Sequence, residues 1–171
     1  MASRKLYGDA QLIAALLKEM QLVEEAAGGW AAVYKGPAAF WMKCYTTAGE
    51  QGGGYELLIR LPLPTTSELI GLAILSPFED EAVAALMRLL DEEAVENKDF
   101  REEMLAQIEA QDLEAVSESQ KQRLRTILTL ADLANPMNKR DVLGKSAEEV
   151  KQDAAYFAAI SERARQLLQK L

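Results

Sequence analysis

A glycine-rich segment separates two runs of alternating apolar residues, and this pattern constrains the fold more than any other part of the chain. The segment spans 48–54, and the flanking runs, 38–46 and 55–61, have the two-residue period of β-strands. Because successive side chains of a strand point to opposite faces, the apolar residues fix the register of an antiparallel hairpin. The predicted pairs are Cys44 with Leu57, Met42 with Ile59, Phe40 with Leu61, Trp41 with Arg60, and Tyr45 with Glu56.

The residues before the hairpin predict a helix and one further strand. Apolar residues recur at helical spacing over 9–27, with Asp9 as the N-cap and Gly28-Gly29 as the end of the helix. Residues 30–34 are predicted to form a short strand. The wholly apolar segment 69–75 fits a fourth strand after the hairpin, and a buried helical turn is the alternative.

Helical patterns dominate from Ser76 to the end of the chain. Ser76 is predicted to cap a helix that has Pro77 in its first turn and ends near 97–99. Two more helices are expected, one marked by Phe100, Met104 and Ile108 and one over 117–134. Ser146 and Glu149 form a capping box that opens a last helix towards Leu171.

These elements predict an α+β fold. It consists of a small antiparallel sheet of three to four strands with an N-terminal helix, followed by about four helices. The composition changes near Ser76, so we divide the chain into a helix-plus-sheet part, 1–75, and a helical part, 76–171. A length of 171 residues suits one domain, and we expect the two parts to pack together.

The amino-acid composition excludes several kinds of active site. The chain has no histidine, which rules out a Ser-His-Asp triad, a Cys-His dyad and a zinc site that uses histidine. Its single cysteine, Cys44, can neither form an internal disulfide nor hold an iron–sulfur cluster. We therefore expect no catalytic residues, no bound metal and no cofactor, although an enzyme with a carboxylate-based site remains an alternative.

The charge is acidic and unevenly distributed along the chain. There are 19 Lys+Arg and 27 Asp+Glu, and residues 79–118 alone hold 3 and 14 of them. Most of this charge is expected to solvate helix surfaces, and an acidic face that meets a basic partner is the alternative. The sequence pI of about 4.7 argues against nucleic-acid binding. No run of eighteen apolar residues is present, so we expect no membrane contact and a cytoplasmic location.

Two sets of residues are candidate interaction surfaces. The outer face of the predicted hairpin carries tryptophan and arginine, which are enriched at binding hot spots, unless a helix covers it. This face comprises Trp41, Lys43, Tyr45, Glu56, Leu58 and Arg60. The last helix has an apolar stripe suited to self-association or to packing within the chain, formed by Phe157, Ile160, Ala164, Leu167 and Leu171.

These features predict a non-enzymatic, acidic protein-binding module of the adaptor, chaperone or inhibitor kind. We expect its partner to be another protein or a second copy in a homodimer or larger homo-oligomer. One alternative is a structural or assembly subunit of a larger particle, such as a phage, and another is the carboxylate-based enzyme.

Overall fold

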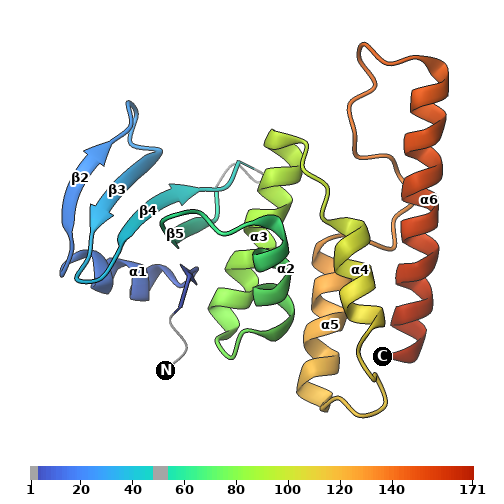
Figure 1. Ribbon diagram of the computed structural model, residues 1–171, viewed down its shortest axis with the longest axis horizontal. Helices are drawn as coiled ribbons and strands as arrows, with labels where there is room; N and C mark the ends of the chain where they lie inside the picture. Colours follow the sequence, from blue (N-terminus) through green and yellow to red (C-terminus); the bar gives the residue numbers. More distant parts are fainter. Residues whose placement is uncertain (1–3, 48–53) are drawn as a thin grey trace. The chain divides into compact units, whose positions relative to one another are not determined.

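The computed structural model describes residues 4–47 and 54–171 (Figure 1). Within these residues the chain has an α+β fold with a five-stranded antiparallel sheet and six helices. It forms two compact units, Met1–Lys98 and Asp99–Leu171. The division falls later than the composition shift at Ser76, so the helix over Glu79–Glu96 also belongs to the unit with the sheet. None of the described helices is long and apolar enough to cross a membrane.

Unit 1 contains the sheet and three of the described helices. Its strands lie in the order β1-β5-β4-β3-β2. The elements are β1 (Leu6–Tyr7), α1 (Ala10–Leu17), β2 (Gln21–Glu25), β3 (Ala31–Lys35), β4 (Phe40–Tyr45), β5 (Glu56–Arg60), α2 (Thr66–Leu75) and α3 (Glu79–Glu96). Every paired strand runs antiparallel to its neighbour, so β2 to β5 form a meander that β1 closes at the far edge.

The predicted register of the central hairpin is confirmed. Strands β4 and β5 pair Cys44 with Leu57, Met42 with Ile59, Trp41 with Arg60, and Tyr45 with Glu56. The fifth predicted pair is also in place, because the Leu61 amide donates to the Phe40 carbonyl over 2.9 Å. Most of the glycine-rich segment that joins the strands, residues 48–53, lies outside the described residues.

The predicted helix over 9–27 is wrong in its second half. Asp9 does cap the helix, since its side chain accepts from the amides of Gln11 and Leu12, but α1 ends at Leu17. The chain then turns and forms β2, which pairs with β3. Gly28 and Gly29 lie between these two strands with φ values of 87° and 71°, so they shape a hairpin turn and do not end a helix.

The predicted fourth strand over 69–75 is wrong, and its helical alternative is correct. Thr65 and Glu68 form a capping box that starts α2, and Leu69, Ile70, Ala73 and Ile74 are its buried residues. Ser76 does not cap the next helix as predicted, because it ends α2 and α3 begins at Glu79. The Ser76 hydroxyl instead donates to Glu81 over 2.6 Å. The sheet thus has five strands where three to four were predicted.

Helices cover both faces of β5. Its consecutive residues Leu57, Leu58 and Ile59 are all fully buried, although they alternate between faces. On the face of Leu57 and Ile59, helix α3 reaches the sheet, since Glu81 accepts from the Leu6 amide and Asp91 accepts from the Thr47 amide. We call this the α3 face. Helix α1 also packs on β5, and its Ile13 is buried. We call the opposite face of the sheet, which carries Leu58, the α1 face.

Unit 2 is helical. It contains α4 (Arg101–Glu109), α5 (Glu118–Leu130) and α6 (Ala147–Lys170), and α6 contacts both other helices. The predicted capping box of Ser146 and Glu149 is confirmed at the start of α6. The predicted helix over 117–134 is capped by Ser117 but ends at Leu130.

The long connection between α5 and α6 is held by ion pairs. Asp153 of α6 binds Arg140 at 2.7 Å and also binds Lys145, while Asp132 binds Lys139 at 2.7 Å. The two cations lower the pKa of Asp153, with the hydrogen bond from Lys145 as the larger cause. Three basic side chains of this connection are therefore satisfied within unit 2.

Candidate protein-binding surface

The α3 face of the sheet is covered at one end and open at the other. At the covered end Cys44, Leu57 and Ile59 are buried. At the other end Phe40 is 46% exposed. Its neighbours on this face, Met42 and the paired Val33, are only half-buried. We define the open sheet face as Ala31, Val33, Phe40 and Met42.

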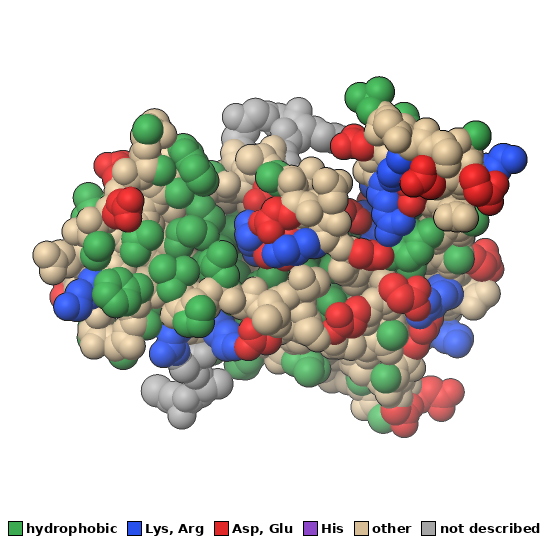
Figure 2. All heavy atoms as spheres, turned by 45° about the horizontal axis from the view of Figure 1, so that its top comes forward, with side chains coloured by type: hydrophobic (Ala, Val, Ile, Leu, Met, Phe, Trp, Pro, Cys, Tyr) green, Lys and Arg blue, Asp and Glu red, His purple; other side chains and the backbone are tan. Residues whose placement is uncertain are grey.

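The open sheet face is an apolar, slightly hollowed surface. Figure 2 shows hydrophobic side chains gathered over the β2–β4 part of unit 1. A shallow depression of about 120 Å³ lies there, lined by Glu24, Ala26, Ala31, Ala32, Val33 and Met42. Cavities of roughly this size hold a benzene-sized group, so one aliphatic side chain of a partner fits the depression.

The position of the helices explains why this part is left open. Helix α3 contacts β1 and helix α1 contacts β5, whereas β2 and β3 lie at the opposite side of the sheet. Sheets bury their apolar faces against another layer, and unit 1 supplies that layer on the α3 face only near β1 and β5. The apolar residues of the open sheet face can therefore contact another molecule.

The free edge of the sheet is protected. All five residues of β2 are exposed, and the strand carries a β-bulge between Leu22 and Glu24. Bulges and charged side chains are devices that prevent another strand from pairing with an edge, and Glu24 and Glu25 supply the charges. The open sheet face is therefore a better docking surface than the edge next to it.

The six residues of the predicted hairpin surface share one face, as their register requires, and it is the α1 face. Leu58 is fully buried there, while Tyr45 is exposed. Lys43 bonds Glu56 at 2.9 Å, and this contact raises the pKa of Lys43. The Trp41 ring packs on Tyr7 at a centroid distance of 5.6 Å. Glu56, Trp41 and Arg60 are only partly exposed.

The predicted self-association stripe lies in the interior of the molecule. Phe157, Ile160, Ala164 and Leu167 are each at most 3% exposed, and Leu171 is half-buried. Helix α6 packs against α4 and α5, so these side chains form the core of unit 2. The structure gives the stripe an intramolecular use, which was the alternative drawn from the sequence.

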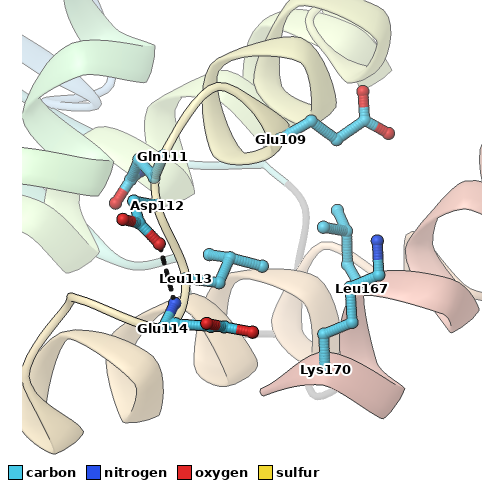
Figure 3. Close-up of a pocket in the computed structure, with 7 residues that line it drawn as sticks. All are labelled: Glu109, Gln111, Asp112, Leu113, Glu114, Leu167 and Lys170. Atoms are coloured by element: carbon cyan, nitrogen blue, oxygen red, sulfur yellow. Dashed lines mark hydrogen bonds between the residues drawn. The ribbon is translucent and has the colours of Figure 1, made fainter.

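Unit 2 also has an open groove of about 530 Å³ (Figure 3). Leu113 and Leu167 face each other across it, and Asp112 accepts a hydrogen bond from the Glu114 amide over 3.2 Å. On its rim Glu109 binds Arg163 at 2.7 Å, which lowers the pKa of Glu109. The groove is lined by two leucines, three carboxylates and Lys170. It was not predicted, because its residues come from the end of α4, the following turn and the end of α6.

Buried carboxylates of unit 1 have structural partners. Glu81 accepts from the amides of Lys5 and Leu6 at 2.6 and 3.1 Å. Glu92 binds Arg88 at 3.0 Å. Burial raises the pKa of Cys44 to about 11, so its thiol is protonated at neutral pH and is a poor nucleophile. Across the described residues, no three His, Cys, Asp or Glu side chains are grouped to hold a metal ion.

No family model, curated protein or solved structure matches the chain. The surface therefore has to be interpreted from its own geometry and chemistry.

Proposed function

We propose that the chain is a non-enzymatic protein-binding module, such as a cytoplasmic adaptor or chaperone, that holds its partner on the open sheet face. The observation that carries the proposal is the uneven cover of one continuous sheet face. Strand β4 places Phe40, Met42 and Cys44 on that face, yet only Cys44 is buried. A second layer over the open residues would complete the packing that α3 begins.

Burial of the open residues by a partner would contribute part of the free energy of binding. Complete burial of a large apolar side chain contributes about 1.5–3 kcal/mol, and these side chains are already partly buried. Phe40, Met42 and Val33 together therefore supply a few kcal/mol. That is the size of contribution expected from the centre of a small, reversible interface.

The proposal is tested by photocrosslinking followed by a binding measurement. A benzophenone amino acid is placed at position 40, and the matched control carries it at position 12 of α1. Leu12 is a suitable match because its exposed fraction, 44%, is similar to that of Phe40. Both proteins are irradiated in cells of the source organism. We expect a discrete crosslinked protein at position 40 only.

The captured protein is then purified and titrated by calorimetry against the whole chain. We expect Met42→Thr to weaken binding at least tenfold and Leu12→Thr to leave it unchanged. Equal crosslinking at the two positions, or binding that does not respond to Met42→Thr in a folded protein, overturns the proposal.

A further inference from the structure

We infer that the occupant of the open sheet face is a single basic amphipathic α-helix of about three turns. This inference rests on the proposed function and specifies the partner class. Four features of unit 1 carry it: the size of the open face, the charges around it, the protected edge and the helices already present on the same face.

The dimensions of the open face suit one helix. Strands lie about 4.8 Å apart and rise about 3.3 Å per residue, so five residues from each of β2, β3 and the six-residue β4 cover about 14 by 17 Å. An α-helix with its side chains is about 10–12 Å wide, and about 11 residues span 17 Å. One helix of three turns therefore covers the open residues, and its apolar face has room for one side chain in the depression near Met42.

The net charge of unit 1 favours a basic partner. Unit 1 holds 8 Lys+Arg and 14 Asp+Glu, a net charge of −6. Glu24 lies on the open face itself, paired with Val33, and Lys35 lies at its far end opposite Phe40. Near the Cys44 end, Asp91, Glu92 and Glu96 of α3 form ion pairs with Arg88 of the same helix, and Glu96 also pairs with Lys98, which follows the helix. Figure 2 shows acidic and basic side chains in the same view as the apolar patch.

An extended peptide is a poorer occupant than a helix. Strand addition needs a free edge whose amides and carbonyls are regularly spaced. The bulge between Leu22 and Glu24 breaks that spacing in β2, and the two glutamates add charge to the strand. Helix packing on the face has no such requirement. It is also the arrangement that α3 already adopts on the same side of the sheet.

A second copy of the chain is a poorer occupant than a helix because of the small area of the open face. A stable interface buries about 800 Å² on each partner. The open face covers only about 240 Å² in projection, from the strand spacings given above. A short helix fits this area.

The test uses two displayed peptide libraries with the full chain as bait. One presents 14-residue segments on a helical scaffold, and the other presents eight-residue segments in extended form. The best peptide from each library is synthesised, and its affinity is measured by fluorescence anisotropy. We expect the helical library to yield the tighter binder, with apolar residues at i, i+3, i+4 and i+7 and Lys or Arg beside them.

Variants then locate the binding site. Met42→Thr should lower the affinity for the helical peptide at least tenfold, and Glu24→Lys should lower it about threefold. Leu12→Thr should leave this affinity unchanged. Circular dichroism confirms that each variant is folded. Binding should also weaken with added salt, because part of the attraction is between charges near the surface.

The outcomes separate this inference from the proposed function. If an extended or acidic peptide binds more tightly and its binding still depends on Met42, the inference of a basic helix is wrong, and the proposed protein-binding function is retained. Met42-dependent dimerisation in sedimentation also overturns the inference, in favour of a second copy. Absence of any Met42-dependent peptide overturns the inference, while the crosslinking experiment decides the proposed function separately.

Discussion

The two ends of strand β4 differ although their side chains lie on the same face. Cys44 is 7% exposed beside α3, whereas Phe40, four residues earlier, is 46% exposed. Alternation along the strand gives both the same direction, so the difference comes from the helices and not from the strand. The comparison teaches that strand periodicity assigns a residue to a face, while only the tertiary arrangement decides whether that face is covered.

The covered and open ends should therefore respond differently to mutation. At the covered end, side chains are packed on every side and their loss leaves a cavity. At the open end, the same loss removes surface that is already in contact with water.

The largest effect is expected for Ile59→Ala at the covered end. Ile59 is fully buried, and truncation of such a residue costs about 2–5 kcal/mol in the free energy of unfolding. Val33→Ala on the open face is the matched change and should cost less than about 1 kcal/mol. Urea unfolding of both variants measures the difference. Equal losses would mean that the open end is packed as tightly as the covered end.

The next effect concerns the carboxylate that joins α3 to β1. Glu81 is buried and accepts from the amides of Lys5 and Leu6 and from the Ser76 hydroxyl. Glu81→Ala removes these acceptors, and we expect a loss of about 2–3 kcal/mol in the free energy of unfolding. Glu81→Gln retains an acceptor oxygen, so its free energy of unfolding should fall by less. If the two variants unfold at the same urea concentration, these hydrogen bonds do not fix the covered end.

The third effect is a pH dependence at Cys44. Burial raises its pKa from 9.0 to about 11, with Arg88 opposing the shift and Asp91 adding to it. Above pH 9 the unfolded chain loses the thiol proton more readily than the folded chain. Stability is therefore retained below pH 9 and falls as the pH rises towards 11, by about 2 kcal/mol. Subtracting the pH profile of Cys44→Ala isolates this contribution, and parallel profiles would show that the thiol is not shielded.

The smallest effect on stability is expected for Phe40→Thr at the open end. Phe40 is nearly half exposed, and threonine suits a strand, so the free energy of unfolding should change by less than about 1 kcal/mol. Binding of the partner should nevertheless weaken about tenfold. A large loss of stability would show that Phe40 belongs to the core and would remove the contrast between the two ends.

The sequence predicted the local features that depend on a few neighbouring residues. The register of β4 and β5 was predicted because the apolar side chains on both strands match in only one alignment. The cap of α6 was predicted because Ser146 and Glu149 have the required spacing.

Features that depend on distant contacts could not be predicted. Gln21–Glu25 has too little alternation to be recognised as a strand and is one because β3 pairs with it.

The segment 69–75 is apolar throughout, so only the capping box of Thr65 and Glu68 distinguishes helix from strand, and that signal was missed. The open sheet face had no sequence signal either. Phe40 and Met42 follow the same alternation as the buried Cys44, and the helix that covers Cys44 comes from a later part of the chain.

The place of β1 in the sheet also has a consequence for the order of events during synthesis. Strands β2 to β5 pair with sequence neighbours and can close as soon as they leave the ribosome. Leu6 pairs instead with Ile59 and is held by Glu81, so β1 is made early and docks late. Until about residue 81 has emerged, β5 presents an unpaired side in the nascent chain, and the polypeptide is most exposed to misassembly in that interval.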